Sequence, residues 1–262
     1  MQYAFLIVFV FAVFPVSHAT AQSPRDIPLE EFAALPVNSG VRLSPNGENV
    51  LIVTTYQGHR VVLVKPLMKG GDFQGVAIPP QEGMDIRWAR WKNDDYILIA
   101  MSFEYRRYAE TGLGIETRLM AVPIYNPKKA KNMAIPPKEV NAAPGVAQIG
   151  RGIVGGANNI PRLQADVVDF LPNDQEHFLL EIDEDASDRA YEVRRVEITT
   201  GNYKLVHDPS NDGSDWITDL TGTVRFGYGG RYAGASLSDV KFSWHYLNPE
   251  TGQWVVYKES QF

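Results

Sequence analysis

Short runs of apolar residues alternate with turn-forming residues along this chain. One pattern recurs four times, in which a polar turn of Ser, Pro, Asn, Asp or Gly separates two runs rich in Val, Ile and Leu. The four copies begin at Val41, Trp88, Val167 and Ile217. Such runs predict pairs of β-strands. One pair cannot bury its own apolar face, so the copies are expected to stack on one another.

The spacing of the copies predicts the blades of a β-propeller. The turn residues Asn46 and Asp94 are 48 positions apart, and Asn173 and Gly222 are 49 apart. Repeats of about 40–50 residues with four strands each are typical of propellers. The expected fold class is all-β, a partial β-propeller of about four four-stranded blades. A β-sandwich, whose strands also recur every 8–12 residues or so, is the alternative, and the longer repeat disfavours it.

The same pattern gives approximate boundaries for the blades. They are expected at residues 37–80, 84–136, 166–208 and 216–258. Within the second blade, the middle strands are expected at Tyr96–Phe103 and Thr117–Ile124. A segment near 126–160 is rich in Pro, Gly, Ala and Lys and has neither a strand nor a helix period. It predicts a long insertion.

The first residues predict export from the cytoplasm. An apolar run from Ala4 to Val16 is followed by Ala19-Thr20-Ala21, which indicates a signal peptide over residues 1–21, cleaved after Ala21. The run is too short for a membrane span, and none is expected in the mature chain. A linker and a short helix are expected over residues 22–36. The predicted location is periplasmic or secreted.

Composition narrows the classes of partner. The net charge is −6 at pH 7, which argues against a nucleic acid or an anionic membrane as partner. The chain has no cysteine, so it has no disulfide framework and no lipid-attachment cysteine.

Two motifs of catalysis or cofactor binding can be set aside. Acyl transfer needs a G-x-S-x-G turn, and Gly234–Ser238 around Ser236 lacks the final glycine. Gly150–Gly155 matches the glycine pattern of dinucleotide sites, but the following Pro161 opposes the helix that such a site needs. No catalytic residue and no cofactor are therefore expected.

Metal ligation has weak support. Asp183, Asp185 and Asp188 offer the oxygen ligands that Ca²⁺ prefers. Their segment lacks the glycine and the terminal glutamate of a Ca²⁺-binding loop, so a solvated hairpin tip is the favoured interpretation. The histidines occur singly, without metal spacing. No metal site is expected.

One polar group is a candidate for contact with a substrate or partner. Tyr105, Arg106, Arg107 and Tyr108, together with Arg118, are expected around the loop between the middle strands of the second blade. Arginines beside aromatic rings can hold a peptide carboxylate and stack on side chains. The alternative is a polar loop packed on its neighbours.

Several stretches resemble a known family. Residues 29–47 resemble the start of bacterial serine peptidases of the prolyl oligopeptidase (S9) family, and residues 167–174, 191–201 and 244–254 are similar to a later propeller blade of that family. The resemblance implies a propeller that screens peptides by size above a C-terminal α/β-hydrolase domain with a Ser, Asp, His triad.

Two hypotheses for function follow, because the sequence ends at Phe262 before any hydrolase domain. The first is a non-catalytic, substrate-gating propeller segment of an exported S9 peptidase, whose partner is a peptide substrate shared with the missing hydrolase domain. The second is a stand-alone periplasmic propeller that binds a ligand or a protein partner. Under either hypothesis, open propeller edges are expected to cause self-association.

Overall fold

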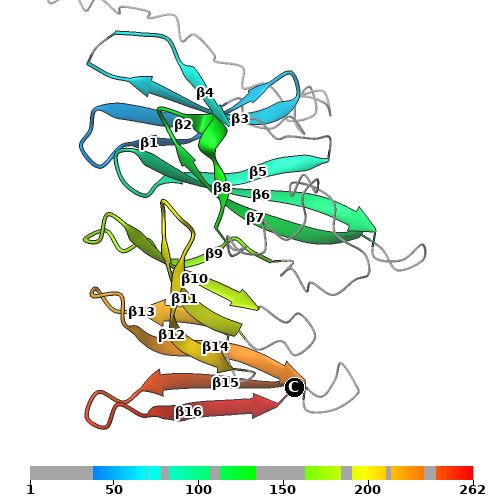
Figure 1. Cartoon of the computed structure of the whole chain (residues 1–262). Coiled ribbons are helices and arrows are strands. Elements are labelled where there is room, and N and C mark those ends of the chain that lie inside the picture. The colour runs from blue at the N-terminus through cyan, green and yellow to red at the C-terminus, as the bar shows by residue number, and fades with distance from the viewer. Residues whose placement is uncertain are drawn as a thin grey trace, which may run out of the picture. The chain divides into compact units, whose positions relative to one another are not determined.

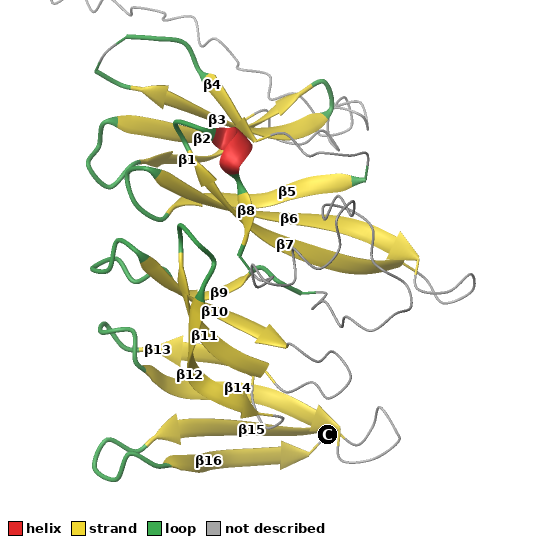
Figure 2. Ribbon diagram, viewed as in Figure 1, coloured by secondary structure: helices red, strands yellow, loops and turns green. Residues whose placement is uncertain are grey.

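The fold is all-β. The computed structural model describes residues 38–68, 70–77, 83–106, 113–133, 163–183, 191–210, 214–232 and 240–261. The strands among them form four four-stranded antiparallel sheets, and the one helical element described is a 3-10 turn, η2 (Pro127–Lys129) (Figure 2). This confirms the predicted fold class, a partial β-propeller with four four-stranded blades. The predicted signal peptide and short helix lie outside the described residues, as does most of the predicted insertion.

Each sheet is a meander, in which every strand pairs with the next strand along the chain (Figure 1). Blade 1 contains β1 (Asn38–Leu43), β2 (Asn49–Tyr56), β3 (His59–Pro66) and β4 (Gln74–Ala77). Blade 2 contains β5 (Met84–Trp91), β6 (Tyr96–Arg106), β7 (Leu113–Pro123) and β8 (Lys131–Asn132). Blade 3 contains β9 (Asp166–Asp169), β10 (His177–Asp183), β11 (Tyr191–Glu197) and β12 (Tyr203–Ser210). Blade 4 contains β13 (Ser214–Thr218), β14 (Val224–Tyr232), β15 (Val240–Leu247) and β16 (Trp254–Gln261).

The core consists of three apolar clusters, and each joins two consecutive blades. In β6, Ile97 and Ile99 belong to the cluster shared with blade 1, whereas Leu98 belongs to the cluster shared with blade 3. In β10, Phe178 packs toward blade 2 and Leu179 toward blade 4. Successive side chains of a strand point to opposite faces, so a strand covered on both faces reads as an unbroken apolar run. Each fully buried aliphatic side chain of this kind contributes about 1.5–3 kcal/mol.

The recurring polar turns are also joined from blade to blade. The backbone N–H of Asn46 in blade 1 donates to Asp94 Oδ1 in blade 2 at 2.9 Å. The side-chain amide of Asn93 in blade 2 donates to the carbonyl of Gln175, in the turn between β9 and β10 of blade 3, at 2.8 Å. Between blades 3 and 4, Thr218 Oγ1 donates to Asp169 Oδ2 at 2.7 Å. The turns that identified the repeat therefore also connect its copies.

The middle strands of blade 2 are longer than the sequence pattern predicted. β6 continues to Arg106, and β7 begins at Leu113, where the prediction had Phe103 and Thr117. Eleven residue pairs continue the ladder from Tyr96↔Pro123 to Arg106↔Leu113. The backbone of Tyr105 and Arg106 is therefore strand rather than loop, because pairing with β7 outweighs the weaker apolar pattern at the end of the run.

The two terminal sheets keep large apolar side chains in contact with solvent. Leu43 in blade 1 and Ile217 and Tyr257 in blade 4 are each more than half exposed. Some apolar residues of the middle blades are exposed too, such as Ile115 in blade 2 and Leu205 in blade 3, although most lie in the clusters between neighbouring sheets. These exposed side chains are compatible with the predicted self-association, which stays a prediction.

A glycine in blade 4 determines how a tryptophan packs. Trp216 on β13 lies over Gly227 on β14, where a Cβ atom would come within 2.1 Å of the indole ring. The same ring makes edge contacts with His207 and Trp254, with centroids 4.1 and 5.4 Å apart. Trp216 is 6% exposed and belongs to the cluster between blades 3 and 4.

We predict that Gly227→Ala destabilises the chain by about 1–3 kcal/mol, because the added methyl group collides with a rigid, buried ring. The measurement is the midpoint of urea unfolding. Gly75→Ala is the matched control, because a Cβ there meets no atom within 4 Å. Equal midpoints for both variants would contradict the packing described for Trp216.

Candidate functional site

A pocket of about 440 Å³ opens beside the first strands of blades 2, 3 and 4. Its walls combine aromatic rings, carboxylates and one arginine, which is the composition expected of a binding site rather than of a core defect. The residues that line it are Trp88, Arg90, Ala165, Asp166, Val167, Val168, Phe170, Glu181, Asp215 and Trp216.

Glu181 is the most unusual residue of this pocket. It follows Leu179 on the face of β10 that packs toward blade 4, at a position where the strand pattern calls for an apolar residue. It is 7% exposed. Its carboxylate accepts a long hydrogen bond from the backbone N–H of Trp216, at 3.3 Å, and the backbone N–H of Asp215 also acts on it. Burial raises the pKa of Glu181, hydrogen bonds from the backbone of Trp216 and Asp215 act against that shift, and the nearby carboxylates of Asp166 and Asp215 add to it; the resulting pKa is about 7.

Asp215 has a strained backbone next to Glu181. Its φ is +56°, in the left-handed region that few non-glycine residues adopt, although Asp is among the more tolerant. The register of β13 against β14 shifts at this point, between Ser214 and Ile217. This local irregularity turns the N–H of Trp216 toward Glu181. Strain of this kind costs about 1–3 kcal/mol and is often found at binding sites.

Asp166 is the third carboxylate of the pocket. Desolvation by the surrounding protein raises its pKa, although the residue keeps contact with solvent; Arg87 acts in the opposite direction and Asp215 in the same direction. No ion pair between described residues involves Asp166, Glu181 or Asp215. The pocket therefore holds three carboxylates without a direct counter-ion from the described part of the chain.

Aromatic rings form the opposite wall. Trp88 and Phe170 meet edge to face, with centroids 6.0 Å apart. The guanidinium of Arg90 lies 5.4 Å from the Phe170 centroid and 5.8 Å from that of Trp88. These distances are within the range of cation–π attraction. The wall thus already accepts a guanidinium from the protein itself.

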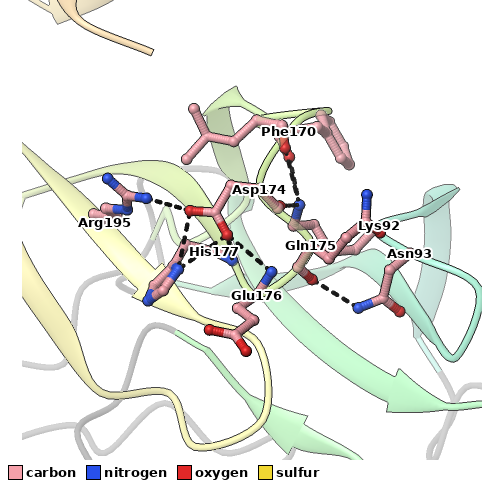
Figure 3. A network of polar contacts seen from close by, with 9 residues as sticks. Lys92, Asn93, Phe170, Asp174, Gln175, Glu176, His177 and Arg195 are labelled. Carbon is pink, nitrogen blue, oxygen red and sulfur yellow. Dashed lines mark hydrogen bonds and ion pairs between the residues drawn. The ribbon is translucent and has the colours of Figure 1, made fainter. Parts of the chain in front are cut away.

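A buried lysine fixes the turn that carries Phe170 (Figure 3). Lys92 is 5% exposed, and its ammonium donates to the carbonyls of Phe170 at 2.8 Å, Leu171 at 3.3 Å and Asp174. Burial lowers the pKa of Lys92, while the carboxylate of Asp174 opposes that shift. The three carbonyls replace the hydrogen bonds to water that the ammonium loses on burial. Because Lys92 belongs to blade 2 and the carbonyls belong to blade 3, these bonds also join the two blades next to Phe170.

Asp174 continues the same network on the blade 3 side (Figure 3). Its carboxylate accepts bonds from the backbone N–H of Glu176 at 2.9 Å, from His177, and from Arg195. Burial opposes ionisation, but these donors together hold the pKa of Asp174 well below its usual range. The charges of this network are paired internally, which indicates a structural role.

A second pocket, of about 450 Å³, lies at the turn ends of blades 3 and 4. Its charged residues are Asp174 and Arg195, which form an ion pair with each other. Because these two charges neutralise one another, this pocket offers a ligand less than the pocket around Glu181 does.

Of the contact residues predicted from the sequence, the structure describes the side chain of Arg118. Arg118 is buried on β7, where it donates to Glu116 Oε2 at 2.8 Å and lies 4.9 Å from the Phe103 ring centroid. Tyr105 and Arg106 belong to β6, and Arg107 and Tyr108 lie outside the described residues. Arg118, the one of the five whose side chain is described, does not line the pocket around Glu181.

The remaining candidates can be placed as follows. Asp183 ends β10, whereas Asp185, Asp188 and Ser236 lie outside the described residues. Within the described ranges, no three His, Asp or Glu residues are close enough to hold a metal ion.

One serine–histidine pair was not anticipated. Ser243 Oγ and His245 Nε2 are 2.8 Å apart on β15. Nucleophilic catalysis needs such a hydrogen bond and also an open approach for substrate. Ser243 is buried, and neither residue lines the two pockets described above. The pair is best explained as polar packing between neighbouring strand positions.

The sequence held one signal for this site that the pattern analysis missed. Glu181 interrupts the apolar run Phe178–Ile182, and a charged residue at a core position is informative because it is rarely buried without a reason. Asp166 and Asp215 give no comparable signal, since each lies at the start of a short strand, β9 or β13, and interrupts no apolar run. Their proximity depends on how blades 3 and 4 pack.

Comparisons with known proteins give limited information. No protein-family model matches the sequence, and no curated protein matches it. Among solved structures, the chain is similar to TolB from Acinetobacter baumannii (10% identity, 87% of this chain, 45% of that chain, TM-score 0.38). It is also similar to an acylaminoacyl peptidase (12%, 80% and 31%, 0.40) and to oligopeptidase B from Trypanosoma brucei (12%, 87% and 28%, 0.35).

The chain therefore spans less than half the length of each of these three proteins. At such identities and TM-scores, the similarities do not identify an activity for this chain. In the described part of the chain, no helix is long and apolar enough to cross a membrane.

We predict that Lys92→Met destabilises the chain by about 3 kcal/mol, because it leaves buried carbonyls without a donor. Lys131→Met is the matched control. Lys131 also joins blade 2 to blade 3, through Thr199 O at 2.7 Å, but it is exposed, so a loss below about 0.5 kcal/mol is expected. Urea unfolding measures the stability of both variants. Similar losses of stability would contradict the importance of the buried Lys92 donor.

We predict that Glu181→Gln stabilises the chain at pH 8.5 and has little effect at pH 4. The pKa of Glu181 is higher in the folded state, about 7, than in the unfolded state, so ionisation of this acid opposes folding. The loss of stability begins as the pH rises above the unfolded-state pKa, and it reaches its full size above pH 7. The expected gain at pH 8.5 is up to about 3 kcal/mol. Unfolding curves at both pH values measure it, with the exposed Glu250→Gln as control. A gain that does not depend on pH would refute the explanation.

Proposed function

We propose that this chain is a non-catalytic propeller segment that binds and orients peptides, as part of an exported serine peptidase of the S9 type. The observation that carries the binding role is the pocket around Glu181, which has aromatic walls and three carboxylates without a direct counter-ion among the described residues. The S9 context rests on the resemblance of the turns and strands in the sequence, and export rests on the predicted signal peptide.

The pocket has the chemistry of recognition rather than of bond breaking. The described residues that line it include no Ser, Thr, Lys or His, so among them there is no pairing of a nucleophile with a general base. Its groups suit the holding of a ligand: carboxylates that accept hydrogen bonds, and rings that stack. In a peptidase of this type, hydrolysis would then occur in a separate hydrolase domain, and the propeller would determine which peptides reach it.

The stand-alone binding propeller remains the second candidate. The same pocket would then serve a ligand or a protein partner with no enzyme attached. The genomic sequence that follows the codon for Phe262 separates the two candidates. We expect a reading frame that contains G-x-S-x-G followed by an acid and a His, and unrelated sequence there would favour the stand-alone propeller.

We predict that the purified chain, expressed without residues 1–21, binds peptides but does not hydrolyse them. The measurements are fluorescence anisotropy with a labelled peptide library, turnover of fluorogenic peptides, and labelling with a fluorophosphonate probe. A known serine hydrolase in the same assay confirms that the probe is active. Turnover, or labelling of any serine of this chain, would contradict the non-catalytic assignment, and lack of any peptide binding would contradict the recognition role.

A further inference from the structure

We infer that the pocket around Glu181 binds the guanidinium or ammonium group of an Arg or Lys side chain in a peptide. This inference rests on the proposed peptide-binding function and names the class of ligand. It is carried by three features of the pocket, the charge of its lining, the spacing of its acids and its aromatic wall; a fourth observation is an unpaired donor on a residue that lines it.

The charge of the lining favours a cation. Of the residues that line the pocket, Asp166, Glu181 and Asp215 are acidic and Arg90 is basic. The acids come from β9, β10 and β13, so three strands from two blades direct acceptors to one space. A cation would receive charge-assisted hydrogen bonds there, which are about twice as strong as neutral ones.

The spacing of the acids selects an organic cation over a metal ion. A divalent metal ion needs several ligand oxygens within bonding distance of one point. In the described part of the chain, no three acidic or histidine side chains meet that condition. A guanidinium, by contrast, presents five donors in a plane and can bridge acceptors that lie farther apart. The volume of about 440 Å³ is within the range of small-molecule sites.

The aromatic wall offers the second requirement of a guanidinium, a flat apolar surface. Arg90 is mostly exposed, and its guanidinium lies over Phe170 and Trp88 at 5.4 and 5.8 Å. The structure thus contains an internal example of the contact that a ligand arginine would make. Lys92 holds the Phe170 carbonyl from behind, so this part of the wall is fixed before a ligand arrives.

The unpaired donor is the indole N–H of Trp216. Trp216 is 6% exposed and lines the pocket, and its Nε1 has no hydrogen-bond partner among the described residues. A buried donor without an acceptor costs about 1–3 kcal/mol.

Binding of a cation should depend on pH. Glu181 is partly protonated near neutrality, since its pKa is about 7, and a bound cation favours the ionised form. The other charged groups around it are Asp166 on β9, Asp215 on β13, and Arg87 and Arg90 on β5. The acids oppose its ionisation, and the nearby positive charges favour it. Affinity for a cationic peptide should therefore rise between pH 5.5 and pH 8.

The test is isothermal titration of the full chain with acetyl-Ala-Arg-Ala-amide and with the same peptide carrying citrulline, which keeps the shape but not the charge. We expect the arginine peptide to bind at least tenfold more tightly at pH 8, and more weakly at pH 5.5. Glu181→Gln and Asp166→Asn should each weaken its binding about tenfold. Glu250→Gln removes the same charge from an exposed turn far along the sequence and should leave binding unchanged.

The outcomes separate the two proposals. Equal binding of the arginine and citrulline peptides would overturn the cation preference and leave peptide binding intact. Tight arginine binding that Glu181→Gln and Asp166→Asn do not weaken would overturn the assignment to this pocket. If neither these peptides nor any member of the labelled library binds, both the inference and the proposed function fail. Unfolding curves of each variant verify that it is folded.

Discussion

A four-stranded sheet with apolar side chains on both faces cannot be stable in water until each face is covered, and the rest of this structure depends on that requirement. Blades 2 and 3 meet it by packing between neighbours, through side chains such as Ile97, Leu98 and Phe178. The packing brings the first strands of successive blades together, and the pocket is formed where those of blades 2, 3 and 4 approach. The site is therefore a product of the stacking and belongs to no single blade.

Two buried charges show how differently the protein treats ionised groups. Lys92 donates to three carbonyls, so its burial attaches blade 2 to blade 3. Glu181 has only backbone N–H groups as its described donors, those of Trp216 and Asp215, and lies near two further acids. A buried charge with complete partners stabilises a fold or is at least tolerated, whereas one with incomplete partners is costly unless a ligand completes it. This contrast is the physical reason for assigning a structural role to Lys92 and a binding role to Glu181.

Much of the fold was accessible from the sequence, because the polar turns and the apolar runs recur at a fixed spacing. The four-blade, four-strand arrangement follows from those local signals. The end of β6 at Arg106 did not, since pairing with β7 extends the strand beyond its apolar run. The site was harder to predict. Glu181 is recognisable as a charged residue in an apolar strand, but Asp166 and Asp215 come together only through contacts between blades. Arg118 was predicted as a contact residue, although in the structure it forms an ion pair with Glu116.

Each apolar cluster joins one blade only to the next, and every sheet is a meander of consecutive strands. The order in which a ribosome delivers the chain is therefore also the order in which its sheets can be completed. None of the described strands pairs with a strand from the far end of the chain, so blade 2 can close over blade 1 before blade 3 has been synthesised. The order of these contacts therefore suits assembly during translation.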